Sequence, residues 1–139
     1  MLSSKTYSIT ARHISQQAYT KASNTGVSDE LGHSVALDGD TLVVGAPFEA
    51  SNGIGVNPST QNDNNAVESG AVYVFTRSSG VWTQQAYIKA SNAEAGDQFG
   101  WSVADPAIPG LSRPISKRRT PAAAISLGGV WRSPATRWR

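Results

Sequence analysis

The side chains best able to do chemistry in this sequence are carboxylates and amides gathered in one stretch, residues 49–69. Calcium takes roughly six to eight oxygen ligands, so a stretch of this composition is a candidate calcium loop. Its oxygen-bearing side chains are Glu49, Asn52, Asn57, Asn62, Asp63, Asn64, Asn65 and Glu68. Asn and Asp also favour loops for conformational reasons alone, and their spacing here fits no calcium-loop template. Calcium binding is therefore a hypothesis, and no metal ligand or cofactor is assigned.

Other chemistry has little support in the sequence. The 139 residues include no cysteine, which excludes disulfides, thiol catalysis and thiolate metal sites. His13 and His33 lack metal-ligand spacing, and no Gly-x-Ser-x-Gly nucleophile motif occurs. The stretch Gly53-Ile54-Gly55 resembles part of a dinucleotide-binding motif, but no strand leads into it and no helix follows. We assign no catalytic and no cofactor-binding residue, and we expect a protein that is not an enzyme.

A repeat with a constant offset of 68 residues organises the chain. Residues 16–24 correspond to residues 84–92, since both begin with Gln-Gln-Ala-Tyr and end with Lys-Ala-Ser-Asn. Residues 32–36 correspond in the same way to residues 100–104, with the shared pattern Gly-x-Ser-Val-Ala. A fixed period of this length is typical of structural units that bury their apolar faces against neighbouring units.

The elements that must position these residues are predicted to be strands, because no segment shows a sustained helical period. Asp38-Gly39-Asp40 predicts a tight hairpin turn, and Pro47 lacks the N–H that a continuing strand needs. The last strand is expected to carry Trp82, Ala86 and Ile88 on one side, and the aromatic residues are interpreted as packing residues. The predicted strands cover residues 14–24, 31–37, 41–46, 70–76 and 81–90.

The fold class is therefore all-β. Four strands between Leu31 and Ala90, joined in up-and-down order, predict one four-stranded antiparallel β-propeller blade. We expect an N-terminal leader, the last strand of a preceding blade with its linker, a complete blade, the start of the next blade and an irregular basic tail. These parts are residues 1–13, 14–30, 31–91, 92–104 and 105–139. A single blade would expose both apolar faces, which predicts a marginally stable or aggregation-prone monomer.

The motifs resemble the bacterial form of the FG-GAP repeat and are similar to the blades of the integrin α-subunit β-propeller. The resemblance covers about residues 14–104, and Leu31 stands in the first unit where the second has Phe99. The motif residues are Leu31, Gly32, Gly45, Ala46, Pro47, Phe99 and Gly100. The resemblance implies a propeller of several blades, a role in adhesion or in binding a protein or carbohydrate ligand, and an extracellular or cell-surface location.

The resemblance does not extend to a calcium site between the first two strands. Many FG-GAP blades hold calcium in a loop at this position, whereas the connection here is only Asp38-Gly39-Asp40. Two carboxylates that flank a tight turn cannot surround a cation unaided, because calcium needs more ligands than they provide. We interpret them as solvated side chains of a hairpin.

The charge differs sharply between two parts of the chain. Residues 1–104 hold five basic and nine acidic side chains, a net charge of −4, whereas residues 105–139 hold seven basic and one acidic, a net charge of +6. A basic arm that binds nucleic acid is one interpretation. We favour the other, in which residues 105–139 are a frameshifted or wrongly assigned end that is disordered, because the repeat stops abruptly in mid-unit.

Targeting signals are not evident. No apolar run approaches the roughly 20 residues that span a bilayer, and residues 1–8 lack the apolar core of a secretory signal. We expect a non-catalytic binding or adhesion segment that is an incomplete piece of a larger propeller. The alternatives are an enzyme built on a complete propeller, or nucleic-acid binding through the tail.

Overall fold

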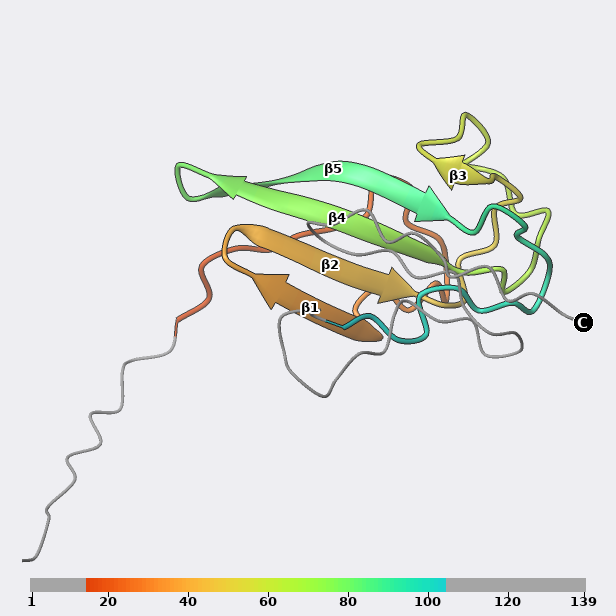
Figure 1. The fold of residues 1–139 in the computed structure, drawn as a ribbon, viewed down its shortest axis with the longest axis horizontal. Helices are drawn as coiled ribbons and strands as arrows, with labels where there is room; N and C mark the ends of the chain where they lie inside the picture. Colours follow the sequence, from red (N-terminus) through yellow and green to blue (C-terminus); the bar gives the residue numbers. More distant parts are fainter. Residues whose placement is uncertain (1–14, 105–139) are drawn as a thin grey trace, which may run out of the picture.

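The computed structural model describes residues 15–104, and this part of the chain forms one antiparallel β-sheet with no helix (Figure 1). The predicted leader and basic tail, residues 1–13 and 105–139, lie outside the described residues. The sheet has five strands in the order β1-β2-β4-β5-β3. Their bounds are β1 Ser34–Asp38, β2 Thr41–Ala46, β3 Gly55–Val56, β4 Ala71–Ser78 and β5 Val81–Lys89. Within residues 15–104 no helix long and apolar enough to cross a membrane is found.

The hairpin of β1 and β2 forms as the sequence predicts. Asp38 pairs with Thr41, and Gly39 adopts a positive φ of 53°, a conformation that glycine takes without steric cost. The adjacent Asp40 holds the turn against β4, because its carboxylate accepts a hydrogen bond from Arg77 Nε at 2.7 Å. The strand then ends at Ala46, one residue before Pro47. Turn chemistry therefore determines both ends of β2.

The hairpin of β4 and β5 contains a β-bulge that reverses part of the expected face pattern. Val74 pairs with Ala86, but the next residue, Phe75, pairs with Gln84, so one extra residue lies in β5. An extra residue moves every side chain beyond it to the other side of the sheet. Trp82 therefore packs on the opposite face from Ala86, and the prediction that they share a side is wrong.

The sheet has two apolar faces, each with its own core cluster. The Val72 face gathers Ala36, Val43, Val72, Ile88 and Ala90, and the Tyr73 face gathers Val44, Ala46, Ala71, Tyr73, Phe75 and Tyr87. Val72 and Tyr73 are both fully buried. This pattern is typical of a sheet that packs on both sides.

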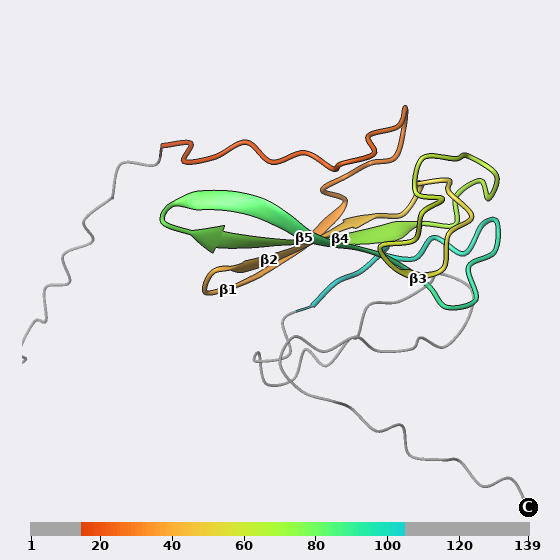
Figure 2. The same cartoon turned by 90° about the horizontal axis from the view of Figure 1, so that it is seen from above.

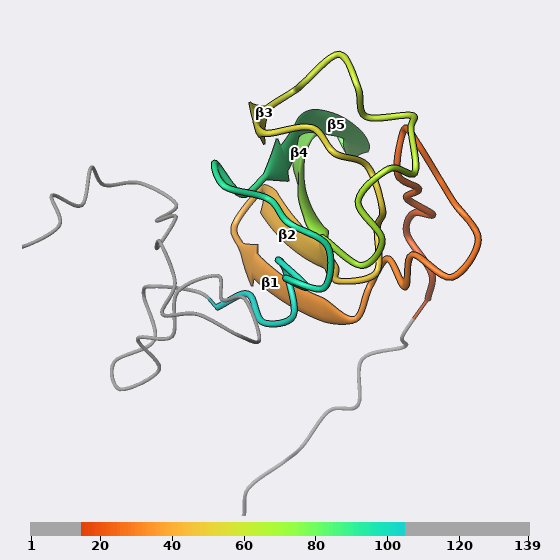
Figure 3. The same ribbon diagram turned by 90° about the vertical axis from the view of Figure 1, so that its right-hand side faces the viewer.

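Both faces are partly covered by the chain's own flanking segments, which the sequence prediction of two open faces did not anticipate. The leading segment, residues 15–31, packs Ala22 and Leu31 against the Tyr73 face. The trailing segment, residues 92–104, packs Phe99 and Val103 against the Val72 face. Figures 2 and 3 show the two segments on opposite sides of the sheet.

The leading segment differs from the predicted strand over residues 14–24. The structure has no strand among residues 15–24, although the segment lies along the sheet (Figure 2). A strand needs a neighbour with which to exchange backbone hydrogen bonds, and this segment lies on the face of the sheet instead of at its edge. Its place is fixed by side chains, since Gln84 Nε2 donates to Ser23 Oγ and Ser23 N donates to Gln84 Oε1, each at 2.9 Å.

The long connection between β2 and β4 adds a short strand that was not predicted. Gly55 and Val56, which form β3, pair with Lys89 and Ile88 of β5. Asn57 fixes this contact, because its backbone N–H donates to the Tyr87 carbonyl at 2.7 Å and its side-chain oxygen accepts from the Tyr87 N–H at 2.8 Å. The connection therefore pairs with the outer edge of β5 at residues 88 and 89. We call this end of the sheet, where the long connection lies, the loop end.

Candidate functional site

A buried ion pair lies at the loop end of the sheet and organises the long connection. Lys89 Nζ lies 2.7 Å from Glu49 Oε2, and the side chains are 0% and 3% exposed. Lys89 is the last residue of β5, and Glu49 follows β2 by three residues. The ion pair therefore links the start of the connection to the end of β5.

Every oxygen position of Glu49 is in use. Its Oε1 accepts from Asn24 Nδ2 at 3.2 Å and from the Ser51 N–H at 3.1 Å. Its Oε2 accepts from Lys89 Nζ and, at 3.2 Å, from Ser51 Oγ. A buried carboxylate that accepts four hydrogen bonds has all of its acceptor positions occupied, so none remains to bind a metal cation.

Lys89 is similarly enclosed. Its ammonium group donates to Ser69 Oγ at 2.6 Å as well as to Glu49. Burial lowers the pKa of Lys89, and the hydrogen bond to Glu49 acts against that shift. The Ser69 hydroxyl donates in turn to the Ser51 carbonyl at 2.9 Å, so it holds two parts of the connection together.

Two tyrosines extend this network on the Tyr73 face. Tyr87 OH is hydrogen-bonded to Ser51 Oγ, and Tyr73 OH donates to Asn24 Oδ1 at 2.8 Å. The two rings are inclined to each other, with centroids 5.2 Å apart. Burial is the main cause that raises the pKa of each phenol above its ordinary value of 10.0. Both are therefore hydrogen-bonding groups that stay neutral at physiological pH.

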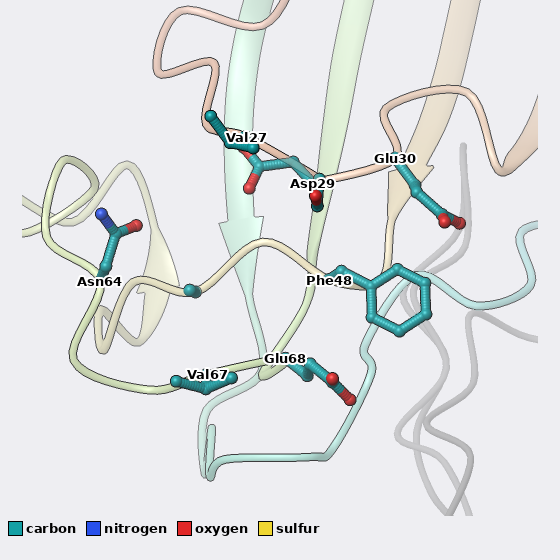
Figure 4. Close-up of a pocket in the computed structure, with 9 residues that line it drawn as sticks. Val27, Asp29, Glu30, Phe48, Asn64, Val67 and Glu68 are labelled. Atoms are coloured by element: carbon teal, nitrogen blue, oxygen red, sulfur yellow. The ribbon is translucent and has the colours of Figure 1, made fainter.

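An open pocket of about 530 Å³ lies between the leading segment and the long connection (Figure 4). Its lining combines the carboxylates Asp29, Glu30 and Glu68 with the apolar side chains Val27, Phe48, Ala50 and Val67, together with Ser28 and Asn64. No basic side chain is among these nine residues. The pocket is therefore acidic with apolar walls, which suits a ligand with a basic or hydroxylated group beside an apolar one.

The carboxylates of this pocket have defined surroundings. Asp29 accepts a hydrogen bond from the Gly26 N–H at 2.6 Å, and partial burial raises the pKa of Asp29 above its ordinary value. Glu30 Oε2 lies 3.1 Å from His33 Nδ1, and Glu68 Oε2 accepts from Gln98 Nε2 at 3.0 Å. Each carboxylate is thus positioned by a neighbour while the pocket stays open to solvent.

The oxygen-rich residues proposed from the sequence are used largely to shape the connection. Asp63 Oδ1 accepts from the N–H groups of Asn52 and Asn65, at 3.0 and 3.1 Å. Asn57 holds β3, and Glu49 binds Lys89. No group of three or more His, Cys, Asp or Glu residues able to hold a metal occurs in residues 15–104. Calcium binding stays a prediction, for which the structure assigns no ligand set.

The motif glycines meet at one corner where backbone approaches backbone. A side-chain carbon on Gly45 would lie 2.0 Å from the Gly100 carbonyl oxygen, and one on Gly100 would lie 2.3 Å from the Ala71 carbonyl oxygen. Ser34 Oγ donates to the same Gly100 carbonyl at 2.8 Å. Only glycine fits such close contacts, so the motif fastens the trailing segment to β2 and β4.

The other motif residues surround this corner. Phe99 is 4% exposed on the Val72 face, and its N–H donates to the Ser69 carbonyl at 3.0 Å. Ala46 is fully buried, and Pro47 is among the fully buried side chains. Leu31 packs on the Tyr73 face, and the N–H of Gly32 donates to the Gly45 carbonyl at 3.1 Å. These residues build the fold and do not line the pocket.

The sequence did not reveal the pairing of Glu49 with Lys89. One signal was present, because Lys89 lies between the apolar residues Ile88 and Ala90, at the end of β5 where the last three residues are buried. A charged residue at such a position needs a partner, since an unpaired buried charge is strongly unfavourable. His33, which lacks metal-ligand spacing in the sequence, packs its ring 4.5 Å from that of Trp101, its equivalent in the repeat.

Comparison with known protein families gives one match. The FG-GAP repeat model matches residues 14–75 and 82–105, which is more than half of the chain. Searches of curated proteins and of solved structures gave no match. The matched residues include the crowded corner of Gly45 and Gly100 and both flanking segments. The protein belongs to the FG-GAP repeat family.

Proposed function

We propose that this sheet is one blade of a β-propeller and that it serves as a non-catalytic module for binding or adhesion. The observation that supports the proposal is an FG-GAP sheet with two apolar faces, each packed against a segment that the repeat relates to a neighbouring unit. Blades pack in this way because a single four-stranded sheet cannot bury both faces by itself. Sister blades are thus the first partners of this chain.

Catalysis is not part of the proposal. Lys89 and Ser69 are in contact, as in a serine–lysine pair, but the Lys89 side chain and Ser69 are both 0% exposed. A nucleophile must reach its substrate, and the surrounding hydrogen bonds give these groups a structural role. The proposed role needs no cofactor. Nucleic-acid binding through residues 105–139 is not proposed, and that segment lies outside the described residues.

The ligand surface is proposed to be the acidic pocket, with a protein or carbohydrate ligand. Phe48 and Val67 offer apolar contact, while Asp29, Glu30 and Glu68 offer acceptors for ammonium, guanidinium or hydroxyl groups. The pocket lies at the loop end of the sheet, where chain segments from three places meet (Figure 4). Loops carried on a rigid sheet are the usual position for recognition.

A matched pair of substitutions tests this assignment. Val67 lines the pocket and is 63% exposed, whereas Val81 is 61% exposed and is the first residue of β5, at the other end of the sheet. Val67→Arg should fill the pocket and place a cation against its carboxylates without disturbing the fold. Val81→Arg should do neither. The full chain is applied to arrays of glycans and of immobilised extracellular proteins.

The expected result is a ligand whose binding falls at least tenfold in Val67→Arg and is unchanged in Val81→Arg. Binding that falls equally in both variants, or that is unaffected by Val67→Arg, would place the ligand elsewhere. An array without any bound component would contradict the proposed binding function itself. Circular dichroism of both variants provides the folding control.

A further inference from the structure

We propose that copies of this chain associate head to tail by displacing their flanking segments, so that the Val72 face of one copy stacks on the Tyr73 face of the next. The proposal rests on the blade assignment above and extends it, since a second copy supplies the neighbouring sheet. Two contacts inside the chain, one on each face, point to the same direction of stacking.

The first contact joins the leading segment to the Tyr73 face. Ala22 packs on that face, whereas Ala90, its equivalent at the offset of 68 residues, packs on the Val72 face. The leading segment thus turns toward the Tyr73 face a side chain equivalent to one that packs, just after β5, on the Val72 face. If β5 of a second copy took the place of this segment, the second copy would bring its whole Val72 face against the sheet.

The polar contacts of the leading segment would also be remade. Asn24 donates to Glu49 and to the Gln61 carbonyl, and it accepts from Tyr73. Asn92 is its equivalent at the offset of 68 residues, and it follows the end of β5 by three residues. The same amide chemistry can therefore arrive from a second copy.

The second contact joins the trailing segment to the Val72 face. Val103 is 9% exposed there, but its equivalent Val35 is 62% exposed. Val35 pairs with Val44, a member of the Tyr73 face cluster, and directly paired residues project to the same side. Val35 therefore lacks, on the Tyr73 face, the neighbour that Val103 has on the Val72 face. The Val72 face of a second copy would supply it.

The motif glycines give the same indication. A side-chain carbon on Gly100 would lie 2.3 Å from the Ala71 carbonyl oxygen, whereas one on its equivalent Gly32 would meet nothing within 4 Å. Both residues have a positive φ, 87° and 100°. The same turn thus occurs twice in the chain. The turn at Gly100 packs against β4, whereas the turn at Gly32 faces open space. Leu37, which is 58% exposed, lies two residues after Val35 on β1 and on the same side of the strand.

In this stacking, a second copy replaces the internal contacts with equivalent ones, so that little is lost; domain swapping is a low-cost route to assembly for the same reason. The additional gain is burial of Val35 and Leu37. The competing internal segments have an effective concentration on the order of millimolar, so association of the unaltered chain is weak. An interface of two different surfaces is heterologous and leads to closed rings or open chains.

The test measures mass against concentration by sedimentation of the full chain, from roughly 10 µM to 1 mM, a range that spans this effective concentration. Asn24→Ala removes the side-chain anchor of the leading segment and should lower the concentration for association at least tenfold. Gln84→Ala, which releases Ser23, provides a second loosened variant with Glu49 untouched.

Adding Val35→Arg to Asn24→Ala should restore the monomer, because the arginine blocks the docking surface. Adding Val56→Arg, a substitution on β3 at a residue 63% exposed, should leave the association unchanged. The proposal is overturned if both loosened variants stay monomeric throughout, or if Val35→Arg has no effect. Because Val67 is not among these contacts, the ligand assay and the mass assay can fail independently.

A mixing experiment fixes the direction. The variant Asn24→Ala/Val35→Arg keeps its Val72 face, and Asn24→Ala/Asn92→Ala keeps its exposed Val35. Head-to-tail stacking predicts that neither associates alone and that the mixture forms a one-to-one complex. Symmetrical pairing of β1 edges predicts instead that Asn24→Ala/Asn92→Ala associates as readily as Asn24→Ala, and that result would reject the proposal.

Discussion

Replacement of Lys89 by methionine is the sharpest test of how the long connection is held. Lys89→Met keeps most of the side-chain volume but removes the ammonium group, so Glu49 stays buried without its counter-charge. Glu49 keeps three donors, from Asn24 Nδ2, Ser51 N and Ser51 Oγ, at 3.1 to 3.2 Å. Breaking a buried ion pair from one side costs about 3–5 kcal/mol, and the remaining donors place the expected loss near 3 kcal/mol.

Urea unfolding followed by circular dichroism measures this loss. The double variant Glu49→Gln/Lys89→Met removes both charges and should be less destabilised than the sum of the single variants, with a coupling of about 2 kcal/mol or more. The matched control is the exposed pair of Asp40 and Arg77, whose side chains are 66% and 37% exposed. Arg77→Met should cost about 1 kcal/mol or less. A loss below about 1 kcal/mol for Lys89→Met, or additive single variants, would refute the reasoning.

Three further outcomes follow from burial and backbone geometry. The raised pKa values of Tyr73 and Tyr87 mean that the folded state binds more protons above pH 10, so the free energy of unfolding should fall there by about 1.4 kcal/mol per pH unit for each tyrosine. The lowered pKa of Lys89 acts in the opposite direction up to its ordinary value of 10.5, so urea titrations should show the steepest fall above that pH. Gly100→Ala should destabilise by about 2 kcal/mol or more, whereas Gly32→Ala, with open space around it, should cost about 1 kcal/mol. Equal melting temperatures for the two alanine variants would contradict the crowded corner.

Local sequence signals predicted the four long strands because the chain marks their ends chemically. The Asp-Gly turn and Pro47 each impose a backbone conformation that can be read without knowledge of the fold. The turn between β4 and β5 has a local cause of the same kind, since Ser79 and Gly80 both adopt positive φ, 50° and 81°. The continuous apolar run at the start of β4, residues 71–75, is equally clear and supplies both faces of the sheet. These features depend on residues adjacent in sequence.

The remainder depends on contacts between distant residues. The bulge in β5 arises from how that strand fits β4, so no pattern within residues 81–90 could show that Trp82 and Ala86 face opposite sides. The pairing of Lys89 with Glu49 joins residues 40 positions apart. Residues 15–24 have the composition of a strand, but without a hydrogen-bonding neighbour they form none.

The two-point attachment of Ser23 by Gln84 has a consequence for hydrogen exchange. Because one amide side chain both accepts from the Ser23 N–H and donates to its hydroxyl, this backbone proton is held in a segment without any sheet ladder. Its exchange with deuterium should be slower than that of the preceding amides and should speed up in Gln84→Ala. Protection of this amide, measured against the amides of residues 15–22, would thus report how firmly the leading segment is attached to the sheet.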